Sequence, residues 1–125
     1  MAPGRQLAFL WGGAALACAA AAPVARDHAA GAPPCVFRSL TGVPCATCGG
    51  TRALLALARL DVGAALAWNP LVAIGVAVFL AGGLVAFVRA LRGQGVPDPA
   101  PPRWAGAAAA FALAANWAFV VLAGR

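Results

Sequence analysis

Residues 69–88 read NPLVAIGVAVFLAGGLVAFV, an uncharged and almost wholly apolar stretch. Asn69 is a preferred helix N-cap residue, and Pro70 suits the first helical position because an N–H group has no intrahelical partner there. A helix of about 20 apolar residues crosses the roughly 30 Å hydrocarbon core of a bilayer. Residues 70–88 therefore predict a membrane-spanning helix.

Two further uncharged apolar stretches occupy residues 7–25 and 104–123. The second carries Asn116 and Trp117 near its end, a pattern typical of anchoring at the membrane interface. The first ends in Ala-Pro-Val-Ala at residues 22–25, so removal as a secretory signal is a second interpretation of this segment. Together with residues 70–88, these stretches predict an all-α membrane protein with three transmembrane helices.

Composition excludes the ordinary soluble classes, because 63% of the 125 residues are hydrophobic and only 10% are charged. The net charge of +6 comes from nine arginines against three aspartates. These arginines are scattered singly between apolar runs, so they do not form the basic stripe of a nucleic-acid-binding surface. The expected partners are the lipid bilayer and either another membrane protein or a second copy of the chain.

The segment between the first two spans divides into two parts. Residues 26–50 are rich in Pro, Gly and Cys and predict an irregular connector. Residues 51–68 predict a helix, and its polar residues Arg52 and Arg59 are seven positions apart and so share one face. This pattern favours a helix lying in the plane of the membrane interface.

Membrane orientation follows positively charged side chains, which gather in short cytoplasmic loops. With a cytoplasmic amino terminus, that side carries Arg5, Arg89, Arg92 and Arg103, and the opposite side carries Arg26, Arg38, Arg52, Arg59 and Arg125. The linker between the last two spans is short, and short loops dominate the rule. We therefore expect a multi-pass protein of the cell membrane with a cytoplasmic amino terminus and an extracytoplasmic cysteine connector.

The connector contains Cys45-Ala-Thr-Cys48-Gly49, a C-x2-C pair followed by glycine. The tight turn directs both sulfurs to one point, and glycine tolerates a left-handed backbone. Cys35 adds a third soft ligand, and His28, the only histidine, is the candidate fourth ligand of a tetrahedral zinc site. The pattern thus makes Cys35, Cys45, Cys48 and His28 a possible metal-ligand set.

Two other chemistries remain open for the same cysteines. A C-x2-C pair before a helix also suits a thiol-disulfide oxidoreductase, with Cys45 attacking and Cys48 resolving. Alternatively, two connector cysteines form a stabilising disulfide. Arg52, in the first turn of the following helix, either extends to lipid headgroups or holds an anion beside the thiols, with Asp61 as a possible partner within the chain.

At these residues the chain resembles a bacterial family of small membrane proteins of unknown function, domain-of-unknown-function family 2752, with the signature Cys-Pro-x-Cys-Gly-x-Thr-Arg-Ala. The matching signature residues are Cys45, Cys48, Gly49, Thr51, Arg52 and Ala53. Asp61, Asn69 and Pro70 are similar to the family's downstream layout, and the resemblance extends from about Cys35 to Val88. Ala46 stands where the family usually has proline, which leaves the turn less rigid.

The resemblance implies a multi-spanning membrane protein and brings no activity with it. We therefore expect a non-enzymatic membrane component whose cysteine and arginine site, at the membrane surface, is stapled by a metal ion or a disulfide and binds a partner or lipid. The alternative is a membrane thiol-disulfide oxidoreductase that uses Cys45 and Cys48.

Overall fold

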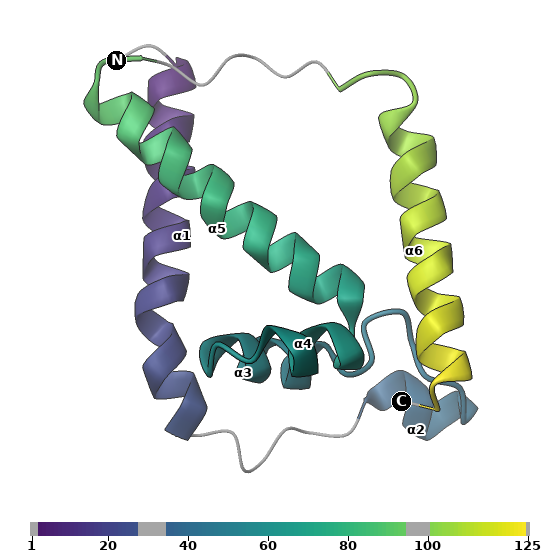
Figure 1. The fold of residues 1–125 in the computed structure, drawn as a ribbon. Helices are drawn as coiled ribbons and strands as arrows, with labels where there is room; N and C mark the ends of the chain where they lie inside the picture. The colour runs from purple at the N-terminus through teal and green to yellow at the C-terminus, as the bar shows by residue number, and fades with distance from the viewer. Residues whose placement is uncertain (1–2, 28–34, 95–100, 125) are drawn as a thin grey trace.

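The computed structural model describes residues 3–27, 35–94 and 101–124, and this part of the chain is helical without any strand (Figure 1). In chain order its helices are α1 (Pro3–Asp27), α2 (Val36–Thr41), α3 (Gly50–Ala58), α4 (Val62–Trp68), α5 (Pro70–Leu91) and α6 (Ala105–Leu122). The long helices α1, α5 and α6 have 25, 22 and 18 residues, and each is long and apolar enough to cross a membrane. The prediction of an all-α protein with three candidate spans is confirmed.

Helices α1 and α5 pack closely because small residues line both sides of their contact. Ala8 on α1 clusters with Ala86 and Ala90 on α5, and all three are buried. A Cβ atom added at Gly12 would lie 2.5 Å from the Cβ of Phe87, so only glycine fits at this crossing. Lipid tails are as apolar as the helix surfaces, so the hydrophobic effect does not drive helices together in a bilayer. Small residues allow such helices to approach closely and to gain van der Waals contact instead.

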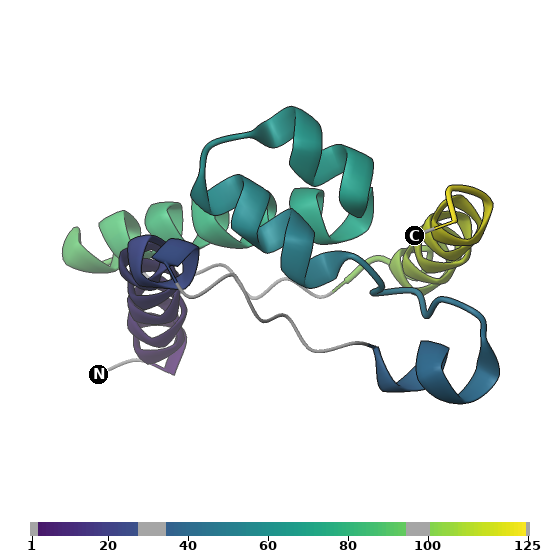
Figure 2. The same cartoon turned by 90° about the horizontal axis from the view of Figure 1, so that it is seen from below.

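The segment predicted as one interfacial helix is divided into α3 and α4. Leu60 has a φ of 61°, a left-handed conformation that ends α3. Asp61 then begins α4, since its Oδ1 accepts a hydrogen bond from the Ala64 N–H at 2.9 Å. The chain therefore doubles back, and α3 and α4 lie side by side across the direction of α1 (Figures 1 and 2).

Helix α5 begins as the sequence predicts, with Asn69 as N-cap and Pro70 as its first residue. Helix α6 stands apart from α1, and its C-terminal end lies near the connector that leads into α3 (Figure 1). Asn116 and Val120, both near that end, are its buried residues. The fold thus brings the start of α5 and the end of α6 to the same place as the cysteine connector.

Candidate metal centre

The cysteine turn is built by backbone hydrogen bonds that lead directly into α3. The Cys48 N–H donates to the Cys45 carbonyl at 3.0 Å, and the Gly50 N–H donates to the Thr47 carbonyl at 2.8 Å. Gly49 has a φ of 78°, and a Cβ there would lie 3.0 Å from the Trp68 carbonyl oxygen. Glycine is thus required twice at this position, for the left-handed backbone and for the close approach of α4.

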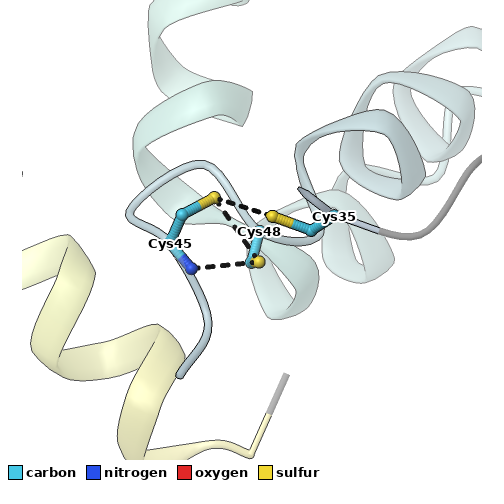
Figure 3. Close-up of side chains that lie close together, drawn as sticks. All are labelled: Cys35, Cys45 and Cys48. Carbon is cyan, nitrogen blue, oxygen red and sulfur yellow. Dashed lines mark hydrogen bonds between the residues drawn. The ribbon is translucent and has the colours of Figure 1, made fainter. Parts of the chain in front are cut away.

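Cys35 reaches the same point from the other side of the connector, where it precedes α2. Its Sγ lies 3.4 Å from the Sγ of Cys45, and the Sγ atoms of Cys45 and Cys48 are 3.5 Å apart (Figure 3). All three sulfurs lie within 4.8 Å of one another. Cys48 is buried, whereas Cys35 and Cys45 are half-buried, so the cluster is closed on one side and accessible on the other.

These distances suit a metal ion bound by thiolates. With Zn–S bonds of about 2.3 Å, tetrahedral geometry separates the sulfurs by about 3.8 Å. The pairs Cys35–Cys45 and Cys45–Cys48, at 3.4 and 3.5 Å, are close to this spacing. The Cys45 N–H also donates to the Cys48 Sγ at 3.1 Å (Figure 3). This bond lowers the pKa of the Cys48 thiol, although burial and the neighbouring thiols raise that pKa overall. The arrangement can therefore hold a soft metal ion with three sulfur ligands.

Asn69 ties the cysteine turn to the start of α5. Its Nδ2 donates to the carbonyls of Ala46 and Cys48, both at 3.1 Å, and its Oδ1 accepts from the Val72 N–H at 3.1 Å. The side chain is fully buried. Because a buried amide must satisfy its donors and acceptor, this geometry fixes the turn relative to the helix.

The end of α6 holds the same turn from a second side. Asn116 Nδ2 donates to the Ala46 carbonyl at 2.7 Å, while its Oδ1 accepts from the Leu71 N–H at 3.0 Å. Trp117 Nε1 donates to the Pro44 carbonyl at 2.9 Å. Together, these bonds join the connector, α5 and α6 into one unit.

Sequence reasoning assigned Asn116 only to interfacial anchoring and so missed this role. The available signal was a single amide within an apolar span, since a polar group in that setting requires a partner. The sequence could not say which backbone atoms that partner would be, because they lie near residue 46, far along the chain.

The pKa values of the two thiols in the C-x2-C pair are shifted in opposite directions. The pKa of Cys45 is lowered to about 7, mainly by a hydrogen bond with the Thr47 hydroxyl and further by those with Cys35 and Cys48, against the effect of burial. The pKa of Cys48 is raised to about 11, mainly by burial and further by hydrogen bonds with the side chains of Cys35 and Cys45, against the effect of the Cys45 backbone N–H. At neutral pH Cys45 is therefore the more nucleophilic thiol of the pair.

The other predicted site residues take separate positions. The Arg52 guanidinium lies over the Trp68 ring, 4.6 Å from its centroid, on the exposed first turn of α3 beside Thr51. Asp61 caps α4, and no ion pair between it and Arg52 is found among the described residues. His28 lies outside the described residues.

The family model described as Protein of unknown function (DUF2752) matches residues 35–83, from the first connector cysteine into α5. No curated protein and no solved structure matches the chain.

Proposed function

We propose a function from the geometry of the site itself, because the family model that matches residues 35–83 is described as a protein of unknown function. The chain is a non-enzymatic integral membrane protein in which a metal ion, bound by Cys35, Cys45 and Cys48, staples the connector to the transmembrane helices. The stapled connector forms a platform at the membrane surface for a protein partner, a second copy of the chain or a lipid.

The convergence of three sulfurs within 4.8 Å is the observation that carries this proposal. Thiolate ligands select soft or borderline metals, and zinc is the commonest of these in structural sites. A structural zinc site takes four ligands, so one position remains for His28 or for a ligand from a partner.

The platform role is supported by the way in which the turn is held. Its backbone carbonyls at Pro44, Ala46 and Cys48 all accept hydrogen bonds from α6 or from Asn69. A surface held in this way loses little conformational entropy on binding. Arg52 extends from it with an exposed guanidinium, whose planar donors suit a carboxylate or a phosphate.

The orientation proposed from the arginines puts this platform on the extracytoplasmic side. On an oxidising face, two of the same sulfurs can instead join as a disulfide, which would replace the metal as the staple. One experiment must therefore distinguish the metal from the disulfide and also show on which side of the membrane the connector lies.

The test labels the cysteines of intact cells with a membrane-impermeant maleimide, using a Cys18→Ser background so that only the connector responds. We expect labelling to appear after treatment with a chelator and not after a reductant alone. Labelling that requires the reductant would show that the staple is a disulfide and not a metal ion. Labelling of all three connector cysteines without either treatment contradicts both staples, whereas a disulfide leaves one of the three free to label. Protection that persists until the cells are permeabilised contradicts the orientation.

Purified protein supplies the second readout. Elemental analysis should find one metal ion per chain in the wild type and in Cys18→Ser, whose cysteine is exposed on α1. Cys45→Ser should lose that ion. A wild-type protein without stoichiometric metal, purified without chelator, would overturn the metal proposal.

A second candidate function is a membrane thiol-disulfide oxidoreductase, favoured by the 3.5 Å approach of Cys45 Sγ to the buried Cys48 Sγ. In such a reaction the Cys45 thiolate attacks a substrate disulfide and releases one substrate thiolate. Cys48 then displaces the second, leaving Cys45 and Cys48 oxidised as a disulfide. The lowered pKa of Cys45 agrees with an attacking role.

Trapping separates this candidate from the staple. If Cys45 and Cys48 form a redox pair, Cys48→Ser accumulates mixed disulfides at Cys45 with substrate proteins, and Cys45→Ser accumulates none. Both variants also carry Cys35→Ser, because the Cys35 Sγ lies 3.4 Å from the Cys45 Sγ and would otherwise release the adduct. Equal absence of adducts in both proteins, with normal protein levels, then excludes the oxidoreductase.

A further inference from the structure

A groove of about 460 Å³ runs along one face of α5 at the other end of the helix pair from the cysteine cluster. Its lining residues are Trp11 from α1 and, from α5, Val78, Ala81, Gly82, Val85, Ala86 and Arg89. Apart from Arg89 at one end, the wall is formed by apolar side chains and the Trp11 indole. The groove is therefore apolar along its length and cationic at one end.

The length of the groove matches one leaflet of a bilayer. Val78 and Arg89 are eleven residues apart on a continuous helix, which corresponds to about 16 Å at 1.5 Å per residue. The hydrocarbon core is about 30 Å thick, so the groove spans roughly half of it. With Arg89 at the depth of the lipid headgroups, the groove therefore extends along α5 into the hydrocarbon of that leaflet.

Arg89 lines the cationic end of the groove, and Arg5 lies on α1 at the same end of the helix pair. The Nε atoms of Arg5 and Arg89 are buried and have no hydrogen-bond partner among the described residues. Both residues lie at the same end of the helix pair, because Ala8 on α1 clusters with Ala90 on α5. A buried guanidinium donor without a partner is costly, and an anion would relieve that cost.

The described acidic residues cannot supply this anion. Asp27 ends α1 at the opposite end from Arg5, and Asp61 lies in the turn between α3 and α4, where it caps a helix. Among the described residues this end of the helix pair therefore has no carboxylate partner, and Asp98 lies outside the described residues. An anionic headgroup would supply the missing acceptor.

We propose that this groove binds one anionic phospholipid, with an acyl chain along the face of α5 from Val78 to Val85 and the phosphate on Arg89 and Arg5. The phosphate satisfies the guanidinium donors, for which its geometry is well suited. The acyl chain fills the apolar wall beside Trp11.

The proposal has a consequence for orientation. Anionic lipids give the cytoplasmic leaflet its negative surface potential. A lipid of that leaflet at Arg89 puts the end of α5 on the cytoplasmic side and its start, with Asn69 and the cysteine turn, on the other side. This agrees with the orientation proposed from the arginines.

The test uses purified full-length protein in a neutral detergent, to which phosphatidylglycerol or phosphatidylcholine with identical acyl chains is added. Native mass spectrometry counts bound lipid, and thermal unfolding reports stabilisation. We expect one phosphatidylglycerol to bind at least about fivefold more tightly than phosphatidylcholine, since one arginine near a membrane surface contributes about that factor.

Three variants assign the site. Arg89→Gln should remove most of the preference for phosphatidylglycerol, whereas Arg92→Gln, an exposed arginine outside the groove, should retain it. Val85→Trp fills the groove from an exposed position and should weaken both lipids. Arg89→Lys keeps the charge and should retain part of the preference, which guards against a folding defect in Arg89→Gln.

Several outcomes would overturn the proposal. Equal binding of the two lipids by the wild type would show that the headgroup is not recognised. An equal loss in Arg89→Gln and Arg92→Gln would indicate general electrostatic attraction. Stabilisation by inorganic phosphate equal to that by phosphatidylglycerol, with Val85→Trp unaffected, would indicate a phosphate site without a lipid.

Discussion

Asn116, near the end of α6, donates a 2.7 Å hydrogen bond to the carbonyl oxygen of Ala46, a residue 70 positions earlier in the chain. Ala46 lies between the two cysteines of the C-x2-C pair. The same carbonyl accepts a second bond from Asn69. The start of α5 and the end of α6 therefore hold one peptide group at the centre of the cysteine turn.

Replacing Asn116 should loosen this junction. Asn116→Leu keeps a similar volume but leaves the Leu71 N–H without its acceptor and removes one donor to Ala46. We expect a loss of about 1–3 kcal/mol in the free energy of unfolding, because a buried polar group is left unpaired. Thermal or denaturant unfolding in detergent measures this loss. Phe111→Leu, at an exposed position of α6, should change little and serves as the control.

The two thiols of the turn should react over different pH ranges. In reduced, metal-free protein the Cys45 thiolate forms as the pH rises through about 7, so its alkylation rate should be half-maximal there. Cys48, with a pKa raised to about 11, should react only in strong alkali. Peptide mapping by mass spectrometry after timed iodoacetamide treatment assigns each rate.

Thr47→Val tests the cause of the lowered pKa. The Thr47 hydroxyl lies 3.4 Å from the Cys45 Sγ and is the largest influence that lowers this pKa. Without it, the alkylation midpoint of Cys45 should move upward toward the usual value of 9.0. An unchanged midpoint in Thr47→Val would contradict the assignment of this cause.

Gly49→Ala should destabilise the turn by about 1–2 kcal/mol, because a left-handed backbone is strained for alanine and the new Cβ meets the Trp68 carbonyl at 3.0 Å. Gly75→Ala is the matched control, since no atom lies within 4 Å of a Cβ at that helical position. The control should be neutral or stabilised by up to about 1 kcal/mol. The changes in the free energy of unfolding measured for Gly49→Ala and Gly75→Ala should therefore differ in sign or at least in size.

Adjacent glycines in α1 test the packing of the two long helices. Gly12→Ala introduces a Cβ only 2.5 Å from the Cβ of Phe87, whereas Gly13→Ala meets nothing within 4 Å. We expect Gly12→Ala to cost about 1–3 kcal/mol through overpacking and Gly13→Ala to be tolerated. Comparable stability of the two proteins would contradict the observed contact between α1 and α5.

The break between α3 and α4 shows where local sequence reasoning stops. Residues 51–68 carry good helix formers, and nothing in their pattern requires a left-handed Leu60. The break places α4 beside α3 and brings the Trp68 ring beneath Arg52. Such a reversal depends on tertiary contacts, which can outweigh helix propensity.

The sequence alone determined the three candidate spans, the start of α5 at Asn69 and Pro70, and the cysteines of the candidate site. These features are local: apolar length, capping chemistry and ligand spacing each act within a few residues. Only the tertiary structure decided that Cys35 joins Cys45 and Cys48 within 4.8 Å and that Asn116 holds their turn. The sulfurs meet because the connector folds back on itself over ten residues, a path that ligand spacing alone leaves open. Asn116 contacts a residue 70 positions away through a backbone carbonyl, a group that every residue carries and that no residue pattern identifies.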